Sequence, residues 1–286
     1  MKKIGRVVKN ISNCYTVDID GKRFDCIPRG KFRKDKVSPV VGDEVLIDVL
    51  DKTIEEIKPR RNYLNRPVVS NVDMALIVTS VKKPDLSLTL LDKLISIVIM
   101  QKIEPVICFS KLDLLEKKEI KEIKLLKKYY ESIGIKVVVN KNKGRIKRIL
   151  KNKVVVITGQ TGAGKSTLLN QLDPSLNLET KPISEALNRG VHTTRHVELY
   201  QIGSFYMVDT PGFSALDFKG ITVDDLKSSF KEFGKYQCEF SDCTHQKEKG
   251  CKVIQGVNKG DIKRTRYENY LRFLGEVYES NSKLYK

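Results

Sequence analysis

The 286-residue sequence has no tryptophan, only three histidines and no long run of apolar residues. Its longest apolar stretches, such as residues 94–100, fall far below the ~20 residues needed to span a bilayer. Residues 1–5 lack the apolar segment of a signal peptide, and no internal repeat or low-complexity linker is evident. We therefore expect a globular, cytoplasmic protein of two or three domains.

Acidic residues are scarce relative to basic ones. Thirty-five Asp and Glu oppose 53 Lys and Arg, which gives a formal net charge of +18 and a pI near 9.5. Such an excess favours a polyanionic partner, either nucleic acid or an anionic membrane. The lysine-rich proteome of an AT-rich organism would also give a basic chain. The charge favours nucleic acid but leaves compositional bias open.

The six cysteines are not expected to form disulfides in a cytosolic chain. Three of them stand singly in strand-like runs: Cys14, Cys26 and Cys108. The other three gather around a histidine: Cys238, Cys243, His245 and Cys251. This cluster indicates a metal site, and a set of buried or redox-active cysteines is the alternative.

The first 66 residues contain short alternating runs, among them "RVVKN", "YTVDID" and "EVLIDVL". Turn residues such as Asp20 and Gly21 separate these runs. Short strands joined by such turns predict a small antiparallel barrel of the OB type. Basic residues cluster in the loop 29–36 around Phe32, and either an RNA contact or a solvated loop would look like this.

The pattern changes after the barrel. Long apolar strands such as "MALIVTS", "PVICFS", "KVVVITG" and "FYMVDT" alternate with helical stretches. Such runs are typical of parallel strands that are buried on both faces, so residues 67–222 are predicted to form an α/β domain. Residues 223–286 are polar and helical and contain the Cys/His cluster. We expect three units: an RNA-binding barrel at 1–66, the α/β domain, and a metal-binding helical domain.

The clearest motif is "GQTGAGKS" at residues 159–166, which matches the pattern GxxxxGK[ST]. It follows an apolar strand and precedes a helix-like stretch. Glycines let successive N–H groups point at phosphate oxygens, and the helix N-terminus adds partial positive charge. Lys165 would reach the β and γ phosphates, and Ser166 would bind Mg²⁺. The predicted nucleotide contacts are Gly159, Gln160, Thr161, Gly162, Ala163, Gly164, Lys165, Ser166 and Thr167.

The identity of the base depends on a second motif, "SKLD", which comprises Ser110, Lys111, Leu112 and Asp113. In GTP-binding folds the Asp of [NT]KxD accepts hydrogen bonds from guanine N1–H and the 2-amino group, which adenine does not offer. Lys111 would lie along the base. Ser110 departs from the usual Asn or Thr, although its hydroxyl resembles that of Thr. A polar helix start with Ser as N-cap is the alternative, and the preceding buried strand favours guanine.

A third element follows the strand "FYMV". Asp209 would hold Mg²⁺ through water, and the N–H of Gly212 would sense the γ-phosphate. In the preceding loop, Thr193 or Thr194 could close on Mg²⁺ as a switch threonine. The base motif precedes the P-loop here, whereas it comes last in ordinary GTPases. A parallel sheet tolerates such a circular permutation, because the strands still meet in space.

In this order of motifs the chain resembles one family over essentially its whole length, the circularly permuted, ribosome small-subunit-dependent GTPases called RsgA. The stretch "CEFSDCTHQKEKGC" follows that family's CxxxxCxHxxxxxC pattern. The resemblance implies an OB barrel, a permuted GTPase domain and a zinc-containing helical domain. It also implies a protein that binds the 30S subunit and its 16S rRNA and hydrolyses GTP during late maturation. We expect a monomer that does not bind membranes.

Two positions depart from the family pattern. Ser110 replaces the usual Asn, and Asn140 with Lys141 replaces the usual Ser-Ala element. We therefore expect weaker binding of the base than is typical of the family. The metal cluster has no such departure: three thiolates and one imidazole satisfy tetrahedral Zn²⁺ and leave no open position, so one structural zinc per chain is predicted.

Hydrolysis requires a group that orients the attacking water. The residue after Gly212 is Phe213, which cannot act as the Gln of Ras-like enzymes does. The family shares this replacement, and its members have been suggested to use a switch-loop histidine, which corresponds by position to His192. His192 could instead only structure the loop. His196 begins a strand-like run, and His245 is assigned to zinc.

Three hypotheses follow. The leading one is a GTPase that assembles the small ribosomal subunit and is released when it hydrolyses GTP. The second is a nucleotide-gated RNA-binding protein with negligible hydrolysis, as Phe213 suggests. The third is an ATP-using enzyme on nucleic acid, which the imperfect SKLD motif allows.

Overall fold

The computed structural model describes residues 1–30, 32, 37–65, 68–176, 197–208 and 218–282. The N-terminal part is a closed five-stranded barrel in the order β1-β2-β3-β5-β4, which confirms the predicted OB-like barrel. Its strands are β1 (Lys2–Ile11), β2 (Cys14–Ile19), β3 (Lys22–Pro28), β4 (Glu44–Asp48) and β5 (Thr53–Ile57). Inward-facing side chains such as Val7, Val17 and Val45 are fully buried, which gives the alternating pattern of the sequence its physical reason.

A buried carboxylate fastens the barrel to the segment that follows it. Asp43 is fully buried and accepts hydrogen bonds from Arg60 Nε at 2.7 Å and from the Ser70 hydroxyl at 2.6 Å. Ser70 lies in a two-stranded ribbon of β6 (Tyr63–Asn65) and β7 (Val68–Ser70). Gly42 has a φ of 93°, and a Cβ there would lie 2.0 Å from the Ser70 carbonyl oxygen. Only glycine fits this close approach of barrel and ribbon.

The centre of the molecule is a six-stranded sheet in the order β10-β9-β8-β11-β13-β12, in which β12 alone runs antiparallel to its neighbour. Its strands are β8 (Met74–Ser80), β9 (Glu104–Ser110), β10 (Lys136–Val139), β11 (Val154–Thr158), β12 (Leu199–Ile202) and β13 (Phe205–Val208). Every residue of β8 and β11 is buried, which explains their continuous apolar runs. The predicted α/β architecture is confirmed.

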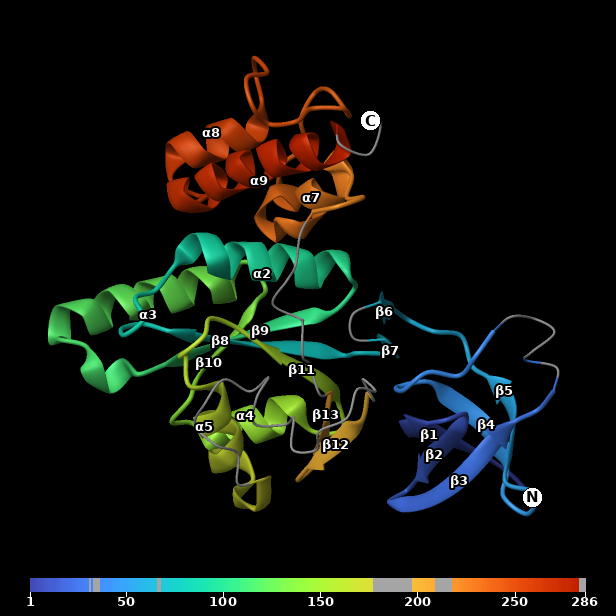
Figure 1. Ribbon diagram of the computed structural model, residues 1–286. Coiled ribbons are helices and arrows are strands. Elements are labelled where there is room, and N and C mark those ends of the chain that lie inside the picture. Colours follow the sequence, from blue (N-terminus) through green and yellow to red (C-terminus); the bar gives the residue numbers. More distant parts are fainter. Residues whose placement is uncertain (31, 33–36, 66–67, 177–196, 209–217, 283–286) are drawn as a thin grey trace.

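Helices cover both faces of this sheet (Figure 1). α2 (Leu88–Met100) and α3 (Lys117–Ser132) lie on one face, and α4 (Lys143–Leu150) and α5 (Lys165–Leu172) lie on the other. α3 begins with a capping box, in which the Glu116 side chain accepts from the N3 backbone and Glu119 accepts from the Glu116 N–H at 2.7 Å. This cap fixes the point where α3 leaves the carboxyl edge of the sheet.

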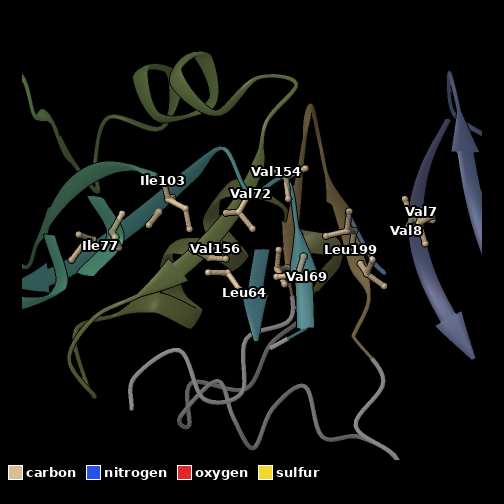
Figure 2. Close-up of a cluster of buried hydrophobic side chains, with 14 of the residues drawn as sticks. Val7, Val8, Leu64, Val69, Val72, Ile77, Ile103, Val154, Val156 and Leu199 are labelled. Carbon is tan, nitrogen blue, oxygen red and sulfur yellow. The ribbon is translucent and has the colours of Figure 1, made fainter. Parts of the chain in front are cut away.

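The barrel packs against the opposite edge of the sheet from β10. Val7 and Val8 of β1 belong to the same apolar cluster as Leu199 of β12, as Figure 2 shows. Next to them, Lys9 and Glu198 form an antiparallel bridge, and their side chains pair at 2.9 Å. The core therefore continues from the barrel into the sheet.

The C-terminal part is helical and packs on α2 (Figure 1). It consists of α7 (Val223–Ser229), the short η3 (Lys231–Lys235), α8 (Lys252–Lys259) and α9 (Arg264–Ser282). Its core is aromatic, with Phe230 in contact with both Tyr270 and Phe273. None of the helices in the described parts of the chain is long and apolar enough to cross a membrane.

A buried ion cluster joins the C-terminal part to α2 and α3. The Arg266 side chain is 1% exposed, and it donates to Asp92 of α2 at 2.8 Å and to Glu232 of η3 at 2.8 and 3.1 Å. The Tyr130 hydroxyl of α3 donates to Asp92 at 2.6 Å, and Asn269 donates to it at 2.6 Å. Burial opposes the charge of Arg266, but the two carboxylates outweigh burial and raise its pKa above the ordinary value.

The Arg266→Met substitution should lower the free energy of unfolding by about 3–5 kcal/mol, because it leaves two carboxylates buried without their counter-ion. Urea unfolding followed by circular dichroism measures this loss. Arg272→Met is the matched control, since Arg272 lies on the same helix, is 68% exposed and pairs with Glu276 at 4.0 Å. The control should cost no more than about 1 kcal/mol, and equal losses in the two variants would contradict the prediction.

Candidate functional site

The P-loop lies between β11 and α5, at the carboxyl edge of the sheet. Its first residue, Gly159, has a φ of 133°, and a Cβ there would meet the carbonyl oxygen of Val78 at 1.9 Å. Gly162 and Gly164 have φ values of 75° and 90°. These left-handed conformations favour glycine, so the predicted glycines occupy the positions where the backbone requires them.

Lys165 begins α5 directly after the loop. Its ammonium folds back over the loop and donates to the carbonyl oxygens of Gly159 at 2.8 Å and Gln160 at 2.9 Å. Burial lowers the pKa of Lys165. Neutral carbonyls do not compensate this charge, so the loop combines backbone donors with a cation that a phosphate group would stabilise. Ser166, the next residue, is buried.

The structure brings the SKLD motif into direct contact with the P-loop. Ser110 ends β9, and β8 separates that strand from β11 in the sheet. The Ser110 hydroxyl reaches across and donates to the carbonyl oxygen of Ala163 at 2.6 Å. Since parallel strands end at one edge, two residues that are 53 positions apart in the chain meet there. A serine is therefore long enough to join the two motifs at this position.

Asp113 lies beyond the end of β9, in the short helix η1 (Leu112–Leu114). Its side chain is 54% exposed, and Lys141 Nζ lies 3.7 Å from its Oδ1. Asn140, beside Lys141, donates its N–H to the Phe109 carbonyl at 3.0 Å, and its own Oδ1 is buried with no hydrogen-bond partner among the described residues. The residues that replace Ser-Ala thus lie next to the proposed base motif.

One contributor to this site was missed by the sequence analysis. The loop after β8 places the carbonyl oxygen of Lys83 where Lys111 Nζ donates to it, and Pro84 Cδ lies 3.6 Å from the position that a Cβ at Gly162 would occupy. The neighbouring Lys82 pairs with Glu119 of α3 at 3.0 Å. The signal that could have revealed this loop is its position, because it follows the strand between β9 and β11.

Several predicted site residues lie outside the described residues: His192, Thr193, Thr194, His196, Asp209, Gly212 and Phe213. The strand that leads to Asp209 is described. β13 ends at Val208 and runs parallel to β11 as its direct neighbour, so the chain leaves the sheet at the edge where the P-loop lies.

The Cys/His cluster forms a compact site between η3 and α8. The Nδ1 atom of His245 lies 3.6, 3.3 and 3.4 Å from the Sγ atoms of Cys238, Cys243 and Cys251, and the four ligand atoms all lie within 4.8 Å of one another. A tetrahedral ion with metal–sulfur bonds of ~2.3 Å places its ligands roughly 3.5–3.8 Å apart. The cluster therefore fits a metal ion in its size and in its donor atoms.

Surrounding hydrogen bonds hold the turn that carries these ligands. The Glu248 carboxylate accepts from the N–H groups of Thr244 at 2.6 Å and Gln246 at 2.8 Å. Burial raises the pKa of Glu248, but these bonds outweigh it and lower the value to about 2. The Tyr267 hydroxyl donates to the His245 carbonyl at 2.7 Å. A charge-assisted turn of this kind prepares the ligands for the metal.

The fold and the site together define a P-loop GTPase with a permuted order of strands. The RsgA GTPase family model matches residues 57–219, and the RsgA N-terminal domain model matches residues 4–54. The chain therefore belongs to the RsgA family and is a GTP hydrolase. Membership of a GTPase family leaves the ATP-using hypothesis without support.

Individual relatives agree along the whole chain. The protein "Small ribosomal subunit biogenesis GTPase RsgA 2" of Oceanobacillus iheyensis is 44% identical over 283 residues, covering 96% of this chain and 97% of the relative. A Staphylococcus aureus protein named "Small ribosomal subunit biogenesis GTPase RsgA" is 44% identical over 290 residues, covering 99% of both chains.

Two solved structures share the fold. YjeQ from Thermotoga maritima is 34% identical with a TM-score of 0.82, and the match covers 97% of this chain and 99% of YjeQ. YloQ, described as a circularly permuted GTPase, is 33% identical with a TM-score of 0.84, and the match covers 98% of this chain and 96% of YloQ. The similarity thus includes the barrel, the sheet and the C-terminal helices.

Proposed function

We propose that this GTPase acts in the late maturation of the small ribosomal subunit, where it binds the 30S particle and its 16S rRNA. The observation that carries the proposal is the full-length similarity to proteins named as small ribosomal subunit biogenesis GTPases. The surplus of +18 charges suits a partner made of RNA. GTP would favour the bound state and hydrolysis would release the protein, which requires different 30S affinities of the two nucleotide states. We propose that it acts as a cytoplasmic monomer.

In this proposal each described part of the site has one task. The P-loop and the first turn of α5, from Gly159 to Thr167, hold the phosphates, and Lys165 gives up its carbonyl partners for the β and γ phosphates. Asp113 accepts from the guanine edge. Ser110 maintains the distance between these two parts through its bond to Ala163. This hydrogen bond thereby links recognition of the base to binding of the phosphates.

Most of the remaining tasks fall to residues beyond the described parts of the chain. Mg²⁺ would neutralise charge on the phosphates, and the oxygen donors that suit it are those of Ser166, Asp209 and either Thr193 or Thr194. The N–H of Gly212 would sense the γ-phosphate. His192 is proposed to orient water, since Phe213 cannot. The unit limits of 1–66, 67–222 and 223–286 likewise stay predictions.

GTP turnover should rise at least tenfold when purified 30S subunits are added to the full-length protein. Phosphate release measured with and without 30S subunits tests this expectation, with 50S subunits as the control for nonspecific effects of rRNA. The proposed function would be contradicted if 30S subunits neither bound to the protein nor changed its GTP turnover. Binding of 30S subunits without hydrolysis would instead support the nucleotide-gated RNA-binding hypothesis.

The Asp113→Asn substitution should weaken GTP binding by tenfold or more and shift preference towards xanthine nucleotides, whose 2-oxo group requires a donor. Competition of GTP and xanthosine triphosphate against a fluorescent guanine nucleotide measures the shift. Asp51→Asn, an exposed position on the barrel, is the control for a lost surface charge. Unchanged GTP affinity in the Asp113 variant would refute the assignment.

The metal of the Cys/His cluster is proposed to be one structural zinc ion. Purified protein should contain one zinc per chain, and Cys243→Ser should remove it and unfold the C-terminal helices before the sheet, because binding energy there is folding energy. Elemental analysis and hydrogen exchange measure the two effects. Cys14→Ser, at an exposed cysteine outside the cluster, should leave both unchanged. Zinc-free protein with protected C-terminal helices would overturn this prediction.

A further inference from the structure

Positive charge is concentrated at one edge of the central sheet. Residues 117–153, which comprise α3, β10 and α4 and are here called the basic edge, contain 14 Lys and Arg against three Glu. This segment carries a net charge of +11, and the other 249 residues together carry +7. Compositional bias would spread lysine along the chain. The concentration in one structural unit therefore requires a local explanation.

The exposed face of α3 carries a line of lysines. Lys117, Lys121, Lys124 and Lys128 are exposed and follow one another at intervals of four, three and four residues, which places them on one side of the helix. The opposite side packs into the core through Tyr130 and its neighbours. Like charges at this spacing repel, so the line is unfavourable for the isolated helix.

The three glutamates of the basic edge do not neutralise this line. Glu119 pairs with Lys82 at 3.0 Å, and Glu131 pairs with Arg145 at 3.2 Å and with Lys127 at 3.9 Å. Glu122 is exposed and forms no ion pair with another described residue. Within the part of the chain that the structure describes, no ion pair joins a carboxylate to any of the four lysines of the line.

The same charge continues around β10 and onto the C-terminal part. On α4, Lys143 and Lys147 are exposed. At the other end of α3, Lys231 and Lys235 of η3 donate to the carbonyls of Gly134 at 3.3 Å and Ser132 at 3.4 Å. β10 is the edge strand furthest from β12, where the barrel packs (Figure 1). The basic edge and the barrel therefore lie at opposite ends of the sheet.

We propose that the basic edge binds the phosphate backbone of folded, double-helical RNA, as a second contact distant from the barrel. This inference rests on the proposed function, since the 16S rRNA of the 30S subunit would supply the helix. Exposed lysines without carboxylate partners are the groups that neutralise phosphates and release counter-ions. They position a nucleic acid without reading its sequence.

The side chains around the lysines favour this partner over two others. Single-stranded RNA is held by exposed aromatic rings, and the aromatics of the basic edge are Tyr130, which is buried, and Tyr129, which is half-buried and donates to Glu232 at 3.3 Å. Membrane-binding helices add a row of large apolar residues to their basic ones. On the exposed face of α3, Leu125 is the large apolar residue, at 62% exposed.

The test replaces all four lysines of the line with glutamine, which keeps the helix propensity and removes the charge. A matched control replaces four exposed lysines that lie outside both the basic edge and the barrel: Lys102, Lys249, Lys252 and Lys259. Binding of a short RNA duplex and of 30S subunits is then measured over a range of salt concentrations. Circular dichroism and basal GTP turnover should show that both variants are folded.

The variant of the basic edge should bind the duplex at least tenfold more weakly at low salt. Its slope of log affinity against log salt should be smaller in magnitude than that of the wild type by up to about 3.6, since each of the four lost phosphate contacts removes about 0.9. The duplex affinity and the salt slope of the control variant should each change by less than half as much. Equal changes in the two variants would overturn the proposal, and so would a loss of binding to phosphatidylserine vesicles without a loss of binding to RNA.

The same measurements separate this inference from the proposed function. A wild type that fails to bind 30S subunits would contradict the function itself. A wild type and a basic-edge variant that bind 30S subunits and duplex equally well would leave the function standing and remove the basic edge from it.

Discussion

The burial of one guanidinium determines how the larger parts of this protein are held together. Arg266 of α9 lies where α2, α3 and η3 meet that helix, and it pairs with two carboxylates there. Its Cζ atom lies 4.4 Å from the centroid of the Phe230 ring. A charge can be stable there only while Asp92 and Glu232 remain in place. Those carboxylates come from different parts of the chain. The C-terminal helices are thus fastened to the sheet by a requirement of electrostatics as well as by apolar contact.

Helix α3 connects this cluster to the nucleotide site. It begins four residues after Asp113, and in its first turn Glu119 pairs with Lys82 in the loop whose Lys83 carbonyl accepts from Lys111. Its last turn contains Tyr129 and Tyr130, whose hydroxyls donate to Glu232 and Asp92. A rigid helix with one end at the base motif and the other in the ion cluster offers a physical connection between nucleotide and metal-binding unit.

Much of the fold could be predicted because its signals are local. Val/Ile runs identified β8 and β11, alternation identified the barrel, and GxxxxGKS identified the loop whose glycines have positive φ. The metal cluster could be predicted because its four ligands lie within 14 residues. The ion cluster could not: Arg266 and Asp92 are 174 residues apart, and a lone charged residue in a helical pattern is ordinarily on the surface. The Lys82 and Lys83 loop was missed for the same reason.

The permuted order of motifs is compatible with this site because the essential contacts join neighbouring strands and do not depend on chain order. Ser110 bonds to Ala163 across the end of β8, so the strand between them must be present, but it can be connected in either direction. Permutation also determines which strands and helices lie at the two edges of the central sheet. The unit α3, β10 and α4 stays at the edge opposite to the barrel, and both of its helices keep an exposed side. On these exposed sides a large surplus of lysine can reach an external polyanion, and this is where the chain has concentrated it.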